Sequence, residues 1–227
     1  MDMAAATRLS KRLSAAGFLG LGGFHPLPED RVPDAGADRP ARTVLMIGSA
    51  GPAFWQAFQN APEAGDGIPH PMDRFTRRVL TDIADEAGLV PVFAFDGPPY
   101  HPFQRWAMRC GGFSQSPIGV LAHRRYGPWI GLRAALVADR HFGEFEAAGT
   151  TGPCPECVEK PCLSACPVEA FSLASGYDVA KCRNHVVSAS GTDCLTGCLS
   201  RRACPVGQDH APLPDQGRFH MRTFVGQ

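Results

Sequence analysis

Apolar residues recur at the spacing of a helical turn in several segments of the chain, with polar residues between them. Between Pro71 and Gly88 apolar side chains return once per helical turn, and charged side chains fill the positions between them. This spacing predicts an amphipathic helix that opens at the proline and ends at the glycine. Shorter segments with similar patterns predict further helices at Leu9–Ala16, Ala53–Gln59 and Pro102–Cys110.

Continuous short apolar runs predict buried strands. Such runs occupy Thr43–Ile47 and Leu89–Phe95. Two more, Ile118–Ala122 and Ile130–Ala138, are separated by a short proline-bearing connection and are expected to pair with each other. Because strands and helices follow one another in turn, residues 1–145 are expected to form α/β layers.

Cysteine use divides the chain into two parts. Eight of the nine cysteines lie between Cys154 and Cys204. We therefore expect two domains, at 1–145 and 150–227, joined by a glycine- and acid-bearing linker at Gly143–Pro153. In a reducing compartment, cysteines this dense are more often metal ligands than disulfides.

Charge and hydropathy restrict the class of partner. The chain has 22 basic residues (lysine and arginine) and 22 acidic residues (aspartate and glutamate), so no net charge favours a nucleic acid or an anionic membrane. The apolar stretch Phe18–Phe24 is interrupted by glycines and is too short for a signal peptide or a spanning helix. We expect a cytoplasmic protein that binds neither nucleic acid nor membrane.

The cysteine spacing predicts two [4Fe-4S] clusters. One run reads C-x2-C-x4-C-x3-C-P, another reads C-x3-C-x5-C-P, and Cys182 lies alone between them. Each cluster takes four thiolates, and in two-cluster ferredoxins the cysteine before the proline ligates the other cluster. The predicted ligands are Cys154, Cys157, Cys162 and Cys204 for the first cluster, and Cys166, Cys182, Cys194 and Cys198 for the second.

Zinc is the alternative occupant, because C-x2-C pairs also form zinc sites. Two Cys-Pro endings and the lone Cys182 are better explained by clusters. Two gaps are longer than in the strict ferredoxin run, which weakens the assignment of ligands to each cluster more than the clusters themselves. The ninth cysteine, Cys110, falls on the apolar face of a predicted helix and is expected to be a buried hydrophobe.

The cysteine arrangement, with Cys182 inside Lys181–Arg183, resembles the iron-sulfur module of epoxyqueuosine reductases and reductive dehalogenases. Gly127–Leu136 resembles the Gly-x-Trp strand motif of epoxyqueuosine reductases and of the vitamin B12-processing decyanase/dealkylase proteins. Ile118–Gly127 is similar to the strand and turn before that motif in the B12-processing proteins.

These resemblances cover roughly 43–204. They imply an α+β protein, in which a nitroreductase-like α/β domain that binds cobalamin precedes a small bacterial-ferredoxin-like domain with two clusters. The first domain is much shorter than the catalytic domains of epoxyqueuosine reductases and dehalogenases. The Asp-x-His-x-x-Gly motif of other cobalamin proteins is absent, although the families named here do not need it.

The resemblance also implies residues for a site in the N-terminal domain. Asp96 follows a strand where epoxyqueuosine reductase has its proposed proton-donating Asp, and a carboxyl shielded from water holds a proton near neutral pH. Arg133 matches an arginine implicated in glutathione or corrin contacts in B12-processing proteins, and Tyr100 and His123 are further cofactor-binding candidates. The plainer interpretations are a turn cap for Asp96, an ion pair on the sheet for Arg133, and ordinary surface groups for the other two.

Three functions fit this sequence. The leading one is electron transfer through two clusters to cobalamin or another acceptor in the N-terminal domain, which would make the protein a cobalamin-dependent or cobalamin-processing oxidoreductase. In the second, the protein is a ferredoxin-like carrier whose N-terminal domain only docks a redox partner protein, and in the third it is a cobalamin-trafficking protein. The expected partners are a redox protein and a corrinoid, and the related N-terminal fold also implies a homodimer. A tRNA-acting function is disfavoured, because no basic helical extension is present.

Overall fold

The chain, a computed structural model, is described at residues 3–145 and 151–226 and divides into two compact units. The predicted linker lies partly outside the described residues, and the domain bounds 1–145 and 150–227 stay a prediction. Residues 112–130 belong with the C-terminal residues and not with their neighbours in sequence. The first unit comprises Met1–Ser49, Ala53–Gly111 and Gly131–Gly149, and the second comprises Ala50–Pro52, Gly112–Ile130 and Thr150–Gln227.

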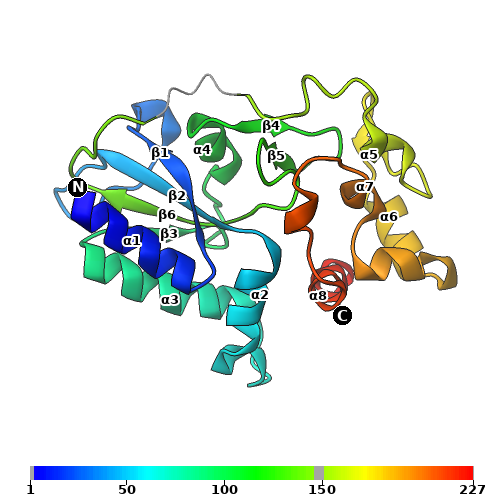
Figure 1. Cartoon of the computed structure of the whole chain (residues 1–227), viewed down its shortest axis with the longest axis horizontal. Helices are drawn as coiled ribbons and strands as arrows, with labels where there is room; N and C mark the ends of the chain where they lie inside the picture. Colours follow the sequence, from blue (N-terminus) through cyan, green and yellow to red (C-terminus); the bar gives the residue numbers. More distant parts are fainter. Residues whose placement is uncertain (1–2, 146–150, 227) are drawn as a thin grey trace. The chain divides into compact units, whose positions relative to one another are not determined.

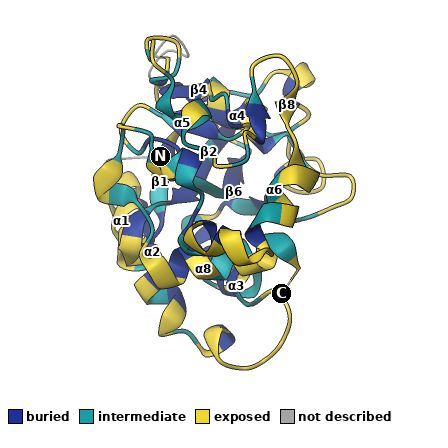
Figure 2. Cartoon of the chain, turned by 90° about the vertical axis from the view of Figure 1, so that its right-hand side faces the viewer, coloured by how far each residue is buried: buried dark blue, intermediate teal, exposed yellow. Residues whose placement is uncertain are grey.

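Within the described residues, the first unit is built on a four-stranded sheet in the order β1-β2-β6-β3, and all neighbouring strands are antiparallel. Strand β2 is almost entirely buried, and β6 is buried from Ala134 to Ala138 (Figure 2), as expected for a sheet with both faces covered. The strands are β1 (Leu19–Phe24), β2 (Thr43–Ser49), β3 (Val90–Phe93) and β6 (Gly131–Ala138).

Helices cover both faces of this sheet (Figure 1). Helices α1 (Met3–Ala15) and α3 (Pro71–Ala87) lie on one face, and α4 (Phe103–Arg109) lies on the other. The predicted helix at Pro71 is confirmed, and it ends at Gly88 in the left-handed conformation, with φ at 64°. Helix α2 (Gly51–Gln59) carries Phe54, whose ring contacts Phe18 at 5.2 Å between centroids.

One predicted strand pairing is wrong. Strand β6 pairs with β2 and β3, whereas β5 (Leu121–His123) pairs with β4 (Phe113–Gln115). The fully buried residues Ala134–Ala138 explain the difference, because a strand this apolar is stable only at the centre of a covered sheet. The sheet is therefore antiparallel, and the α+β fold class is supported in its coarse form.

The glycine-interrupted stretch Phe18–Phe24 contains strand β1, which its sequence did not predict. Glycine is required here, because a Cβ on Gly23 would lie 2.6 Å from the carbonyl oxygen of Val44 on the neighbouring strand. The pairing also shifts register between Gly20 and Gly23, and such bulges often carry glycine. The residues that weaken the strand signal in the sequence thus allow the close approach of β1 to β2.

The second unit consists of short elements joined by loops (Figure 1). A predominance of loops is usual where bound groups, rather than a large core, hold a small domain together. In chain order after β4 and β5 its elements are α5 (Pro161–Ser164), β7 (Phe171–Ser172), β8 (Gly176–Tyr177), α6 (Val179–Val186), the 3-10 helix η3 (Ala189–Thr196), α7 (Leu199–Arg202), the 3-10 helix η4 (Gln208–His210) and α8 (Pro214–Val225).

Two glycines allow a close backbone contact inside the second unit. A Cβ on Gly127 would lie 2.0 Å from the carbonyl oxygen of Val206, and a Cβ on Gly207 would lie 2.3 Å from the carbonyl carbon of Tyr126. Both glycines have positive φ, at 56° and 73°. The turn after β5 is thus held directly against the chain that follows Cys204.

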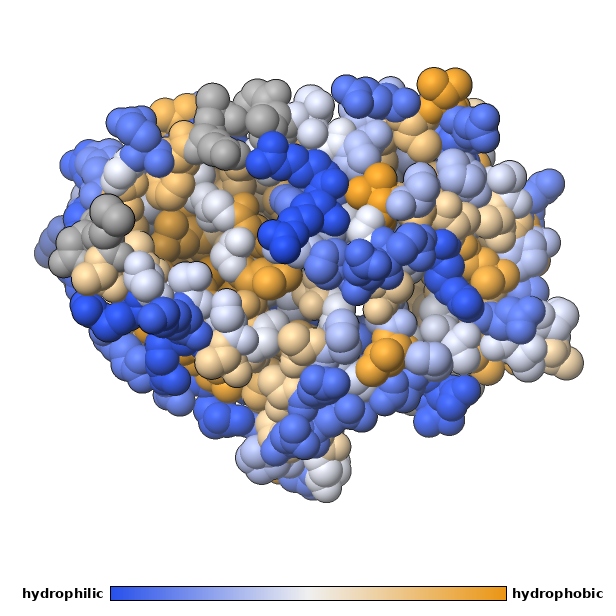
Figure 3. Space-filling view, viewed as in Figure 1, coloured by the Kyte–Doolittle hydropathy of each residue, from blue (hydrophilic) through white to orange (hydrophobic). Residues whose placement is uncertain are grey.

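No helix in the described part of the chain is long and apolar enough to cross a membrane. On the face drawn in Figure 3, apolar and hydrophilic residues are interspersed.

Candidate metal centres and cofactor residues

The eight clustered cysteines line two cavities in the second unit, four in each. The first cavity, with a volume of about 50 Å³, is lined by Cys154, Cys157, Cys162 and Cys204. The second, of about 20 Å³, is lined by Cys166, Cys182, Cys194 and Cys198. The structure therefore brings together the same two sets that the spacing groups, including the return of Cys204 to the first run.

Local structure positions the first set. The backbone N–H of Cys154 donates to the Ser114 hydroxyl at 3.1 Å, which ties the first cysteine to strand β4. The Lys160 ammonium donates to the Cys157 carbonyl at 2.9 Å, at the start of α5. The remaining walls are mainly prolines and small apolar residues.

Burial makes two thiols of the first set less acidic. Burial raises the pKa of the Cys162 and Cys204 thiols, and for each the neighbouring thiols of the set add to the effect. A hydrogen bond from the backbone of Val206 favours the Cys204 thiolate and opposes this increase. The thiols must therefore lose protons when they bind a metal.

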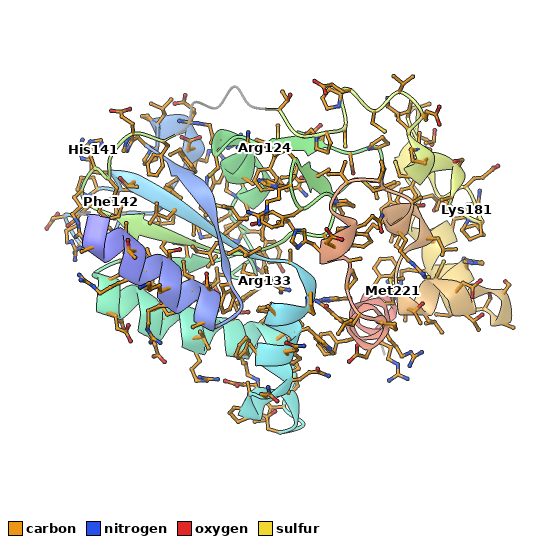
Figure 4. All side chains as sticks on the ribbon, viewed as in Figure 1. Arg124, Arg133, His141, Phe142, Lys181 and Met221 are labelled. Carbon is orange, nitrogen blue, oxygen red and sulfur yellow. The ribbon has the colours of Figure 1, made fainter. Side chains whose placement is uncertain are left out.

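The second set comes from four different parts of the unit: Cys166 follows α5, Cys182 lies on α6, Cys194 lies on η3, and Cys198 precedes α7. Helix α6 is capped by Asp178, whose carboxylate accepts from the Lys181 backbone N–H at 2.9 Å. Met221 of α8, labelled in Figure 4, completes the wall.

Hydrogen-bond donors point at three thiols of the second set. The backbone N–H of Ala170 donates to Cys166 Sγ at 3.2 Å. Burial raises the pKa of Cys182 and Cys194, and hydrogen bonds from the Tyr177 hydroxyl and the Leu199 backbone N–H, respectively, oppose that increase. Such donors favour the deprotonated thiol, the form that binds metal.

The two sets share one apolar cluster. Ile118, Ala170 and Phe171 are buried in it, and Cys162 of the first set packs against it together with Cys166 and Cys182 of the second. The two cavities are therefore neighbours within the unit. Among the residues described, no three His, Cys, Asp or Glu side chains are arranged to hold a single metal ion.

Arg133 lies on β6 in the first unit (Figure 4). Its Nε donates to the Ser49 hydroxyl at 2.8 Å, and its guanidinium lies 4.5 Å from the ring centroid of Phe54. Burial lowers the pKa of Arg133 to about 10, and Asp73 partly opposes this; burial also raises the pKa of Asp73. Spacing alone did not reveal Asp73, because its approach to Arg133 depends on how α3 packs on the sheet.

The other first-unit candidates lie near the surface. The Asp96 carboxylate forms an ion pair with Arg77, and 39% of its side chain is exposed. An exposed, paired carboxylate differs from the water-shielded carboxyl that proton donation requires. Tyr100 is exposed. The proton-donating role of Asp96 and the cofactor-binding role of Tyr100 both stay predictions.

His123 belongs to the second unit, at the end of β5. Its Nδ1 accepts hydrogen bonds from the backbone N–H groups of Arg125 and Tyr126, at 3.1 and 3.3 Å. Its ring contacts those of Phe113 and Tyr126, with centroids 4.8 and 4.9 Å away. These contacts hold the turn before Gly127, and the cofactor-binding role of His123 stays a prediction.

The plainer expectations for buried residues agree with the structure. Trp106 and Trp129 are buried, and so is Cys110, whose pKa burial raises to about 12. A thiol this weakly acidic is a poor nucleophile and a poor metal ligand. Cys110 therefore packs as a small hydrophobe.

Replacing His123 with Asn should flatten the pH dependence of stability. Burial, and then the charges of Arg124 and Arg125, lower the pKa of His123 from 6.5 to about 4. Between these values the unfolded chain binds the proton more readily, so the unfolding free energy falls as pH falls. The expected loss is about 1–2 kcal/mol, because water screens a partly exposed ring. His123→Asn keeps an acceptor for the turn, and urea unfolding at several pH values should show a smaller slope for the variant. Equal slopes of unfolding free energy against pH in the variant and the wild type would show that His123 is protonated as readily in the folded protein as in the unfolded chain.

Comparison with known proteins finds similarity in structure alone. No protein-family model and no curated protein sequence matches the chain. The B12-trafficking protein CblC of C. elegans superposes with a TM-score of 0.58 at 13% identity, covering 99% of this chain and 94% of that one. Epoxyqueuosine reductase of Streptococcus thermophilus gives a TM-score of 0.52 at 14% identity, covering 91% of this chain and 67% of that one.

A reductive dehalogenase, described as B12-dependent, also superposes, with a TM-score of 0.52 at 12% identity. The match covers 96% of this chain and only 33% of the dehalogenase. At these identities the likeness is one of fold. All three belong to the kinds of protein that the cysteine and Gly-x-Trp motifs resemble.

Proposed function

We propose that the second unit binds two [4Fe-4S] clusters and that the protein transfers electrons. The observation that carries this proposal is the division of eight cysteines between two cavities, four in each. A [4Fe-4S] cluster is held by four thiolates, one on each iron, so the thiols surround a space instead of converging on one ion. A zinc site would require four ligands to converge at about 2.3 Å from one point.

The walls of both cavities fit such a group. Ser200 lies on the wall of the second cavity, and its hydroxyl is buried and has no hydrogen-bond partner among the described residues. A bound cluster would supply the missing acceptor, and the Lys160 ammonium on the wall of the first cavity would offset the charge of the thiolates. The apolar shell excludes water, which together with these polar contacts sets the potential of an iron-sulfur site.

The residues of the chain have defined parts in electron transfer. Eight thiols bind and orient two clusters, which supply one-electron chemistry when bound. The shared cluster around Ile118 and Phe171 separates the two sites from water and keeps them adjacent, so that electrons can pass between them. The acceptor lies outside the cysteine sites.

The acceptor that we propose is a corrinoid bound by the first unit. The shared fold with the B12-trafficking protein and the B12-dependent dehalogenase supports this, as does the half-buried guanidinium of Arg133, held by Ser49 and Phe54. A corrinoid carries a phosphate that such a cation could pair with. The alternative is a ferredoxin-like carrier whose first unit only docks a redox protein.

Adding hydroxocobalamin to the anaerobic, reduced protein tests this choice. We expect the cob(III)alamin spectrum to convert to that of cob(II)alamin as the clusters reoxidise. A Cys182→Ala variant should still bind the cobalamin but reduce it more slowly, because one site loses its cluster. Absence of both binding and spectral change in the wild-type protein, with iron present, would favour the electron carrier.

A further inference from the structure

The second cavity differs from the first in its hydroxyl groups. The Tyr177 hydroxyl is hydrogen-bonded to Cys182 of the second set. Ser200 lies on the wall of the second cavity, and its buried hydroxyl has no partner among the described residues. In the first cavity the one serine of the wall, Ser116, already donates to the Val120 carbonyl at 2.6 Å. The two cavities therefore offer different surroundings to otherwise similar sets of four thiols.

The hairpin of β7 and β8 holds Tyr177 beside Cys182. Tyr177 pairs with Phe171 across the hairpin, and their rings stack with centroids 4.5 Å apart. Phe171 is itself part of the cavity wall. Asp178, the residue after Tyr177, caps α6 with its side chain, and its backbone carbonyl accepts from the Cys182 N–H at 3.2 Å, so the hydroxyl and the thiol are fixed to one local structure.

Ser200 is held more deeply. It lies on α7, two residues after Cys198, and only 1% of its surface is exposed. Ser200 lines the cavity, and its hydroxyl has no hydrogen-bond partner among the described residues. Leaving a buried hydroxyl unpaired is unfavourable, so the geometry indicates that its partner is the group that fills the cavity.

We propose that the Tyr177 hydroxyl donates a hydrogen bond to the Cys182 thiolate and that the Ser200 hydroxyl donates one to the cluster in the second cavity. Both hydrogen bonds raise the reduction potential of that cluster. This inference rests on the proposed function. Reduction by one electron adds negative charge to the site, and hydrogen-bond donors stabilise the more negative form. Neither residue ligates iron, so both act as positioning and tuning groups.

The experiment is a redox titration of the full-length protein, followed by electron paramagnetic resonance, on Tyr177→Phe and Ser200→Ala. Both variants are expected to lower the same midpoint potential, that of the cluster in the second cavity, and to leave the other midpoint potential unchanged. A tenfold change in the redox equilibrium would appear as a shift of about 59 mV. The ring stack of Tyr177 on Phe171 survives the first substitution, so the effect reports the hydroxyl.

Ser116→Ala is the matched control. It removes a serine hydroxyl from a cysteine-lined cavity, but one already bonded to a backbone carbonyl, and should move neither midpoint by a comparable amount. If both test variants kept their full iron content and both midpoint potentials stayed at the wild-type values, this inference would be overturned and the proposed function would stand. Loss of iron from the second cavity in both variants would also overturn this inference, because the hydroxyls would then be needed for the structure of the site and not for its reduction potential. A wild-type protein without iron would instead remove the proposed function itself.

Discussion

Replacing Cys204 with alanine is expected to remove one cluster and leave the other. The variant should retain about four of eight irons, because Cys204 closes the first cavity with three cysteines that precede it by more than 40 residues. The cluster that remains should be the one held by Cys166, Cys182, Cys194 and Cys198. Iron analysis and the resonance spectrum of the reduced variant measure this.

Three matched variants test the division of the cysteines. Cys154→Ala should leave the same residual spectrum as Cys204→Ala, since both belong to the first cavity. Cys166→Ala should leave the other spectrum, and Cys110→Ala should keep all the iron, because Cys110 is buried in the first unit. If Cys204→Ala and Cys166→Ala left the same cluster, the division between the two cavities would be wrong.

Replacing Gly127 with alanine is expected to destabilise the second unit strongly. The added Cβ would lie 2.0 Å from the carbonyl oxygen of Val206, and φ at this residue is 56°. Since backbone cannot move as a side chain can, the turn and the segment after Cys204 must separate. We expect a loss of about 4 kcal/mol, at the upper end for a single substitution, with partial loss of the first cluster.

Gly119→Ala is the control for this substitution. Gly119 also has a positive φ, of 80°, but a Cβ there would meet no atom within 4 Å. Only backbone strain remains, and it should cost about 1 kcal/mol. Denaturant unfolding of both variants, followed by visible absorbance and by tryptophan fluorescence, measures the difference. Equal losses would show that the close approach at Val206 does not limit stability.

The grouping of the eight cysteines around two cavities was predictable because cysteine order in two-cluster ferredoxins follows a simple rule of spacing, and their role as cluster ligands stays a prediction. The hydroxyl groups near the second set were not predictable. Tyr177 reaches Cys182 only because β7 and β8 form a hairpin, and no spacing rule marks it. Ser200 lies two residues after a cysteine, but its burial depends on how the surrounding elements close over α7.

The first unit shows a similar limit. Helix α3 was predictable because its apolar stripe and its terminal glycine are local signals. Strand β1 was not, because its glycines lower strand propensity and their purpose appears only against β2. The partners of Arg133, namely Ser49 and Asp73, come from a strand end and a helix that tertiary packing brings together.

The most direct test of the account is a metal and sulfide analysis of protein purified without oxygen. We predict about eight irons and eight acid-labile sulfides per chain, as two four-iron clusters require. The reduced protein should show the resonance of two clusters. Zinc in place of iron, or thiols that bind no metal, would contradict the central claim that the two cavities hold iron-sulfur clusters.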